Sequence, residues 1–303
     1  MNHGQVNIKK CQELDPFLQL YSFFTNIILG QLFSDNYYFY KPDLDKSNNK
    51  WIILLPGSSG LKIFDSTFGK SVENKFQYEF SLDTLRLYDQ SRQREIPIAI
   101  FKPSSKVSGK QKVIIFSHGY GQNKGGDYLA YTYLTEYLAA IGFFVVSIQH
   151  ELATDSLLPL KGNPQIVRRP FWERGADNIL FVINELKRSN PDLDFNHISL
   201  IGHSNGGDMT ALFPEKYPNI VEKIITLDNR RKALPKSKKV KVYSLRSSDQ
   251  PADEGVLPTV KETKKYKMKI VKLANTTHNE MDNNANDKQR REIQEYILTF
   301  IND

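Results

Sequence analysis

From Tyr78 onward, short apolar runs alternate along the chain with longer stretches in which apolar residues recur every three to four positions. The short runs are rich in Val, Ile and Phe and favour strands, whereas the longer stretches have the period of amphipathic helices. This alternation predicts a mostly parallel sheet with helices on both faces, the α/β class. Strands are expected at 113–116, 143–148, 197–201, 224–227, 240–245 and 268–273, and helices at 127–141, 174–187, 204–213 and 288–301.

Two segments with strictly alternating apolar residues precede this pattern. Residues 80–88 and 95–101 are separated by the polar sequence Asp89-Gln90-Ser91-Arg92, which predicts an N-terminal β-hairpin. Farther along, the connection from Asp228 to Val240 is short for a parallel crossover. We therefore expect the helix between those two strands to be vestigial.

The first 75 residues do not follow the alternation, and we interpret them as an extension to a domain of residues 76–303. The uncharged stretch 16–34 predicts a helix that begins at Asp15 and Pro16. The apolar run 51–55 is a candidate for a short buried strand, although periodicity does not distinguish it from a fragment of a helix. Polar residues within 16–34 argue against a membrane span, and the acidic residues before it argue against a signal peptide. A weak contact of this helix with a lipid surface stays open.

Composition and charge narrow the possible classes of protein. The chain of 303 residues is 40% hydrophobic and 25% charged, as in a folded globular protein. A single cysteine, Cys11, excludes an internal disulfide and favours a reducing compartment, so a cytoplasmic location is expected. Much of the net charge of +7 lies in residues 230–241 and 261–272, which form no basic stripe interleaved with stacking aromatics and are expected to flank or form short strands. We therefore expect no nucleic-acid partner.

The sequence Gly202-His203-Ser204-Asn205-Gly206 follows one predicted strand and begins a helix. Gly-x-Ser-x-Gly occurs often by chance, but its position between a strand and a helix is typical of a nucleophile elbow. The backbone of the serine is strained in such a turn, and glycines on both sides avoid collisions with the neighbouring elements. The serine hydroxyl then lies near the positive end of the helix, where negative charge is stabilised. Ser204 is the predicted nucleophile.

Two backbone N–H groups are expected to hold the oxyanion that such a nucleophile produces. One belongs to Asn205, directly after the serine, and the other to Tyr120 in the loop after strand 113–116. A general base must also reach the serine hydroxyl. His278 lies in a polar loop between the last strand and the last helix, at the sheet edge that carries Ser204, and is the predicted base. His150 ends a strand at the same edge; it is the alternative base, or else lines the pocket.

The histidine needs an acid that orients its ring. Asp249 follows the strand before the histidine loop and is the favoured candidate. Asp228, at the end of the preceding strand, and Asp253, four residues beyond Asp249, are alternatives. The mechanism that these residues support requires neither a metal nor an organic cofactor.

The order Ser204, Asp249, His278, with His118-Gly119 upstream, resembles the α/β-hydrolase superfamily over residues 78–303. The segment from Tyr88 to Pro97 is similar to dienelactone-hydrolase-like and platelet-activating-factor-acetylhydrolase-like esterases. This resemblance implies hydrolysis of small-molecule carboxylic esters through an acyl-serine intermediate. Two glycines after Asn205 and the short connection near Arg230 depart from the pattern, and residues 1–75 are not covered.

Specificity is expected to come from the segment 151–171. Leu158 and Trp172 are predicted to line a pocket for short to medium acyl groups. The arginines that could attract an anionic substrate are Arg168, Arg169, Arg230 and Arg231. A peptidase, a thioesterase or a non-catalytic binding protein with this fold are the alternative functions.

Overall fold

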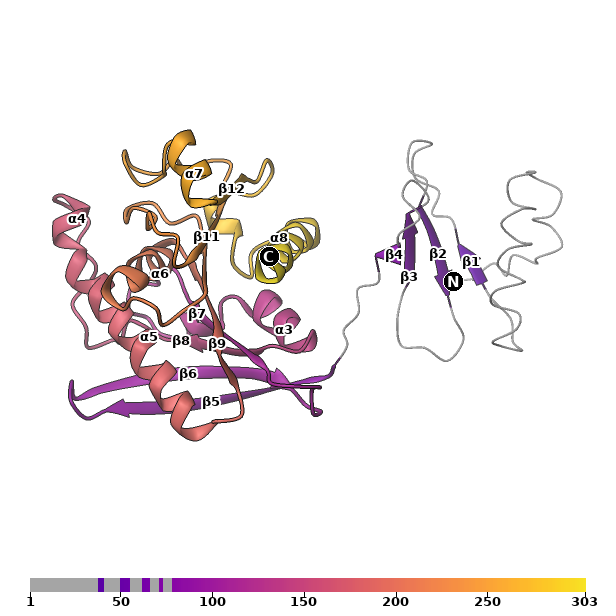
Figure 1. Ribbon diagram of the computed structural model, residues 1–303, viewed down its shortest axis with the longest axis horizontal. Coiled ribbons are helices and arrows are strands. Elements are labelled where there is room, and N and C mark those ends of the chain that lie inside the picture. Colours follow the sequence, from indigo (N-terminus) through magenta and orange to yellow (C-terminus); the bar gives the residue numbers. More distant parts are fainter. Residues whose placement is uncertain (1–37, 41–49, 55–61, 66–70, 73–77) are drawn as a thin grey trace. The chain divides into compact units, whose positions relative to one another are not determined.

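The computed structural model describes residues 38–40, 50–54, 62–65, 71–72 and 78–303 (Figure 1). The chain divides into two compact units, Met1–Lys75 and Phe76–Asp303. The described part of the first unit is an antiparallel sheet with the order β1-β2-β3-β4. Its strands are β1 (Tyr38–Tyr40), β2 (Lys50–Leu54), β3 (Lys62–Asp65) and β4 (Ser71–Val72). The apolar run at 51–55 lies largely in β2, whereas the helix predicted at 16–34 lies outside the described residues.

The second unit is built on an eight-stranded sheet with the order β12-β11-β10-β9-β7-β8-β6-β5. The strands from β12 to β8 are parallel, and β6 and β5 are antiparallel additions at one edge. The strands are β5 (Phe80–Asp89), β6 (Arg94–Pro103), β7 (Lys112–Ser117), β8 (Phe144–Ile148), β9 (Asp194–His203), β10 (Lys223–Leu227), β11 (Lys241–Arg246) and β12 (Lys269–Lys272). The predicted mostly parallel sheet is confirmed.

The hairpin of β5 and β6 forms because Asp89 organises its turn. The Asp89 carboxylate accepts hydrogen bonds from the backbone N–H groups of Ser91 (3.0 Å) and Arg92 (3.3 Å), and Gln93 adopts a left-handed conformation with φ 47°. Ten residue pairs then join the two strands, from Phe80–Pro103 to Asp89–Arg94.

Helices cover both faces of the sheet (Figure 1). In the central strand β7, Val113 and Ile115 face a core that includes side chains of α5, whereas Ile114 and Phe116 face a second core with α3 and α8. Burial on both faces explains why the strand is a continuous apolar run. The helices are η1 (Asp127–Leu129), α3 (Thr132–Ala140), α4 (Pro164–Val167), α5 (Arg169–Ser189), α6 (Ser204–Lys216), α7 (Val260–Tyr266), η2 (His278–Glu280) and α8 (Asp287–Asn302).

Three short helices, α4, α7 and η2, were not anticipated from the sequence. One of them, α7, contains much of the basic run 261–272, which was expected to flank or form strands; the capping box between Thr259 and Glu262 begins this helix. No helix forms between β10 and β11, in keeping with the short connection. Within the described part of the chain, no helix is long and apolar enough to span a membrane.

The carboxyl ends of the parallel strands meet at one edge of the sheet, where chain segments far apart in the sequence come together. The strand order reverses at β7, because β8 lies on one side of it and β9 on the other. Ligands of open α/β sheets bind at such a switch point. The loop after β7 and the residue after β9 lie here.

Candidate active site

Ser204 occupies the sharp turn between β9 and α6. Its φ of 52° lies in the left-handed region, which is uncommon for a residue with a side chain. Strain of this kind persists where the surrounding structure imposes it, and it is frequent at functional sites. Ser204 is the first residue of α6, so its hydroxyl lies at the positive end of that helix.

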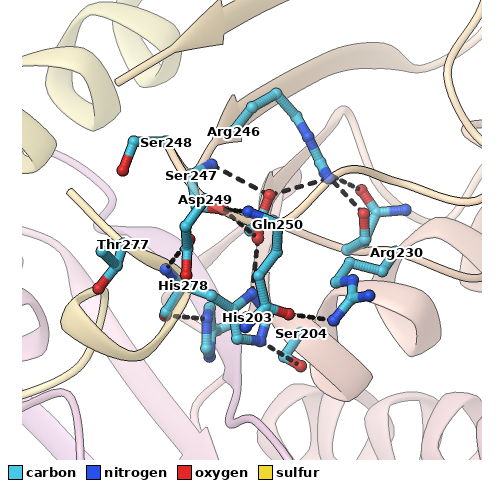
Figure 2. Close-up of polar contacts among 12 residues, drawn as sticks. His203, Ser204, Arg230, Arg246, Ser247, Ser248, Asp249, Gln250, Thr277 and His278 are labelled. Atoms are coloured by element: carbon cyan, nitrogen blue, oxygen red, sulfur yellow. Dashed lines mark hydrogen bonds and ion pairs between the residues drawn. The ribbon is translucent and has the colours of Figure 1, made fainter. Parts of the chain in front are cut away.

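His278 contacts both Ser204 and Asp228. Figure 2 shows His278 beside Ser204. Its Nε2 lies 3.0 Å from Ser204 Oγ, and its Nδ1 lies 2.6 Å from Asp228 Oδ2. With Nδ1–H donating to the carboxylate, Nε2 is free to accept the serine proton. The three side chains therefore have the nucleophile, base and acid arrangement of a catalytic triad.

Asp228 is fully buried and remains suited to carry a charge. Its carboxylate accepts hydrogen bonds from the Ser247 backbone N–H (3.0 Å) and hydroxyl (2.8 Å), and forms an ion pair with Arg246 at 2.8 Å. Burial by itself raises the pKa of Asp228, but the hydrogen bond from His278, the charge of Arg246 and the bonds from Ser247 outweigh burial and lower it. An ionised Asp228 can therefore stabilise a protonated His278.

Asp249, the favoured candidate for the acid, is not the partner of the imidazole. It is exposed, and its carboxylate accepts a hydrogen bond from the backbone N–H of His278 at 2.8 Å. Asp253, the other alternative, pairs with Arg231. Asp228 directly follows β10, and the parallel pairing of β10 with β11, in which Leu227 lies opposite Leu245, places it beside Arg246 and Ser247.

His203 and Tyr131 connect the loops on either side of the serine. The Tyr131 hydroxyl accepts the Gly119 N–H (3.1 Å) and donates to His203 Nδ1 (2.7 Å), while His203 Nε2–H donates to the His278 carbonyl (3.1 Å). Burial lowers the pKa of His203 to about 3, so this ring stays neutral. The network holds the loop after β7 and the loop of His278 at a fixed separation, a role that the sequence did not reveal.

Tyr120 and Asn205, the predicted oxyanion donors, both line the cavity that contains Ser204. Among the described residues, the Tyr120 N–H has no acceptor. The Asn205 N–H belongs to the first turn of α6, where no carbonyl within the helix is available. Both N–H groups can therefore donate to a ligand.

Two hydrogen bonds hold the side-chain amide of Asn205, one at its oxygen and one at its nitrogen. The Trp172 indole N–H donates to Asn205 Oδ1 (3.0 Å), and Asn205 Nδ2–H donates to Glu151 Oε1 (2.9 Å). Trp172 is completely buried and does not line the cavity, which corrects the prediction that it binds substrate. Its indole needs a buried hydrogen-bond acceptor, and Asn205 provides one.

His150 is also not part of the cavity wall, contrary to prediction. Its ring is buried, and its Nε2 lies 2.9 Å from Ser117 Oγ. Burial and the neighbouring His118, Arg94 and Arg174 lower the pKa of His150 well below its ordinary value. His150 is thus a neutral core residue behind the site, and it does not contact Ser204.

The cavity beside Ser204 has a volume of about 220 Å³. This is smaller than the roughly 300–1,000 Å³ of sites for drug-sized ligands. Leu158 lies in its wall, as do three of the four arginines considered in the sequence. The lining residues are Tyr120, Leu158, Leu160, Arg168, Ser204, Asn205, Asp208, Arg230 and Arg231.

Arg169 lies outside the cavity wall and pairs with Glu173 and Glu215. No cluster of three or more His, Cys, Asp or Glu side chains suited to a metal ion occurs among residues 78–303 and the four described strands before them.

Asp208, one helical turn after Ser204, anchors the loop that follows β10. A single carboxylate oxygen of Asp208 accepts the backbone N–H groups of Arg231 (3.0 Å) and Lys232 (2.8 Å). Burial raises the pKa of Asp208 to about 6, although these two bonds, together with the charges of Arg168 and Arg231, act to lower it. Sequence reasoning did not single out this residue.

Asp208 should make the stability of the protein depend on pH. Between pH 4 and 6 the folded protein holds a proton that the unfolded chain has released, so the free energy of unfolding should decrease as the pH rises through this range. A pKa change from 3.8 to about 6 corresponds to about 3 kcal/mol. Asp208→Asn keeps the accepting oxygen and should remove this decrease, measured by urea unfolding at pH 4, 5 and 6.5. The charged groups around Asp208 are Arg168, Arg231 and Arg246, which do not titrate in this range. Equal slopes for the two proteins would contradict the prediction.

The fold is similar to that of several solved hydrolases, whereas the sequence matches no protein-family model and no curated protein. A dienelactone-hydrolase-like promiscuous phosphotriesterase from metagenomic libraries is 14% identical with a TM-score of 0.54, and the match covers 74% of this chain and 98% of that one. The esterase Est22 is 12% identical with a TM-score of 0.55 and coverages of 74% and 81%.

The acylaminoacyl peptidase of Pyrococcus horikoshii is 16% identical with a TM-score of 0.54, and the match covers 89% of this chain. The chain spans half the length of that peptidase and 54% of a thermostable esterase. At these identities the similarity establishes the fold. Residues 78–303 thus have the α/β-hydrolase fold, as predicted from the sequence.

Proposed function

We propose that this protein is a serine hydrolase that cleaves small carboxylic esters through an acyl-serine intermediate. The observation that carries the proposal is the continuous chain of contacts from Ser204 Oγ to His278 (3.0 Å) and from His278 to Asp228 (2.6 Å). These contacts occur at the switch point of an α/β-hydrolase sheet, beside a cavity that contains Ser204 itself.

In the first half of the reaction, His278 Nε2 takes the proton from Ser204 Oγ as the oxygen attacks the ester carbonyl. The carbonyl oxygen becomes negatively charged and accepts hydrogen bonds from the N–H groups of Tyr120 and Asn205. Asp228 stabilises the positive charge on His278. The proton then passes to the leaving alcohol as its C–O bond breaks, and the acyl group stays on Ser204.

In the second half, water replaces the alcohol. His278 takes a proton from the water, whose oxygen attacks the acyl carbonyl, and then returns a proton to Ser204 Oγ as the acid is released. The cavity of about 220 Å³ favours short acyl groups. We therefore expect kcat/KM for 4-nitrophenyl esters to be highest for short chains and to fall as the acyl chain lengthens.

A fluorophosphonate probe tests the proposal directly. The probe should bind covalently to the folded protein, peptide mass mapping should locate it on Ser204, and ester hydrolysis should fall in proportion to the fraction labelled. Heat-denatured protein is the control, because only the assembled site activates the serine. Absence of labelling in folded protein that also fails to hydrolyse an ester library would overturn the proposal. The same screen includes amides and thioesters. Faster hydrolysis of amides than of esters would favour the peptidase alternative, and faster hydrolysis of thioesters would favour the thioesterase alternative.

A further inference from the structure

The cavity beside Ser204 carries an excess of positive charge. Three arginines line it, Arg168, Arg230 and Arg231, together with one acidic residue, Asp208. Pockets for neutral ligands are mostly apolar with few polar groups. Three cations in a cavity of about 220 Å³ are expected to be neutralised by a negatively charged group.

Two of the three arginines form no ion pair with a carboxylate within 4 Å in the described part of the chain. Arg231 pairs with Asp253. Arg168 instead donates through Nε to the Pro159 carbonyl (3.0 Å), and Arg230 donates to the neutral side chain of Gln250 (Figure 2). The positive charges of Arg168 and Arg230 are therefore available to a ligand.

The protein itself compensates the positive charge of this cavity only in part. Burial lowers the pKa of Arg168 and the charges of Arg231 and Arg230 act in the same direction, whereas the charges of Asp208 and Asp253 act to raise it. The Nε–H of Arg230 is buried and has no acceptor among the described residues. A buried donor without a partner is unfavourable, and an anion in the cavity would supply an acceptor.

The arginines are also held in position before any ligand binds. Asp208 fixes the backbone of Arg231 through its N–H, and the Gln165 side chain of α4 donates to the Arg231 carbonyl. The backbone N–H of Asp253 donates to the Arg230 carbonyl at 3.0 Å. A site prepared in this way loses little entropy when it binds an anion.

We propose that this cavity binds an anionic group of the substrate, and that the protein prefers small esters bearing a carboxylate to neutral esters of the same shape. The carboxylate would pair with Arg168 and Arg230 while Ser204 attacks the ester carbonyl of the same molecule. A planar carboxylate matches the paired N–H groups of a guanidinium. This inference rests on the proposed ester hydrolysis at Ser204.

Matched pairs of esters test the preference. Mono-(4-nitrophenyl) glutarate carries the charge on the acyl side, and 4-nitrophenyl 5-methylhexanoate is its neutral counterpart. For the alcohol side, 3-acetoxybenzoate is compared with 3-isopropylphenyl acetate. After subtraction of hydrolysis in buffer, kcat/KM for the charged ester should exceed that of its counterpart about tenfold in at least one pair. No preference in either pair would overturn the inference.

Arginine variants assign the preference to the cavity. Arg168→Gln and Arg230→Gln should each lower the charged-to-neutral ratio about tenfold, because each removes a hydrogen-bonded charge. Arg169→Gln is the matched control, since Arg169 directly follows Arg168 in sequence but pairs with Glu173 and Glu215 outside the cavity wall. A preference that survives both cavity variants, or that Arg169→Gln removes equally, would overturn the inference.

A binding measurement separates this inference from the proposed function. Ser204→Ala removes the nucleophile and leaves the arginines in place, so calorimetry should detect tighter binding of the glutarate ester than of its neutral counterpart. Hydrolysis of esters by wild type without any charge preference overturns the inference and leaves the proposed function intact. Selective binding of the charged ester to Ser204→Ala, with no hydrolysis of any ester by wild type, overturns the proposed function and supports the anion site.

Discussion

Asp228→Asn is expected to lower kcat for ester hydrolysis by about 10⁴, corresponding to about 5 kcal/mol of transition-state stabilisation. The Asp228 carboxylate accepts the Nδ1–H of His278 at 2.6 Å and leaves Nε2 facing Ser204. An asparagine amide can donate to Nδ1 and thereby favour the tautomer with the proton on Nε2, which cannot accept the serine proton. It also removes the negative charge that stabilises the protonated ring.

Asp249→Asn is the matched control for this experiment. Asp249 accepts the backbone N–H of His278 at 2.8 Å, and an asparagine oxygen can accept the same bond. Its kcat should stay within about threefold of wild type, because a net hydrogen-bond contribution of about 1 kcal/mol is the most at stake. Initial rates of 4-nitrophenyl acetate hydrolysis measure both variants, and near-ultraviolet circular dichroism verifies folding. A large loss in Asp249→Asn with near-normal activity in Asp228→Asn would reverse the assignment of the acid.

The rate of fluorophosphonate labelling gives a second readout for Asp228. In wild type, labelling requires a free Nε2 on His278 to accept the serine proton. In Asp228→Asn the ring has its proton on Nε2, so the labelling rate of the folded variant should be far below that of wild type. A purely structural role for Asp228 would lower the fraction of protein that is labelled but keep the wild-type rate for that fraction.

Gly206→Ala is expected to destabilise the protein by at least about 3 kcal/mol and to abolish probe labelling. A Cβ at position 206 would lie under 3.0 Å from the backbone carbonyls of Ser117 and His118 at the end of β7. Alanine normally favours a helix over glycine by about 1 kcal/mol, so steric overlap with two rigid backbone groups must dominate. Moving α6 away from β7 would also separate Asn205 from Tyr120.

Gly109→Ala is the comparison for the effect at position 206. Gly109 has a φ of 78° and no atoms within 4 Å of a would-be Cβ, so alanine there incurs backbone strain alone, about 1 kcal/mol. Chemical unfolding of both variants measures the two effects. If the two variants are equally stable and Gly206→Ala still reacts with the probe, close packing of α6 on β7 is not a requirement of the site.

Much of the architecture could be read from local patterns. The run Val113-Ile114-Ile115-Phe116 is apolar on both faces because one face meets α5 and the other meets α3 and α8. Such burial requires a central position in a sheet covered on both sides. Short elements such as α7 were missed because helices of seven residues carry little periodic signal, and their stability comes from capping and tertiary contacts.

Some residues of the site could also be proposed from the sequence, whereas others required the tertiary structure. Ser204 and His278 could be proposed from sequence, because the elbow motif and the loop after the last parallel strand both lie at one sheet edge by topology. The acid could not be decided, since Asp228 and Asp249 both follow strands at that edge. The choice depended on which carboxylate faces the imidazole and which faces the backbone N–H of His278.

The sequence by itself determined the fold class and led to Ser204 and His278 as the proposed nucleophile and base, because periodicity and strand order are local properties that place the ends of parallel strands together. Only the tertiary structure decided which carboxylate contacts the His278 imidazole, the burial of His150 and Trp172 away from the cavity, and the gathering of Arg168 with Arg230 and Arg231. These depend on side-chain direction and on packing between segments 50 or more residues apart, as between Asp228 and His278. No local pattern specifies such contacts, because their energy arises only once the sheet has assembled.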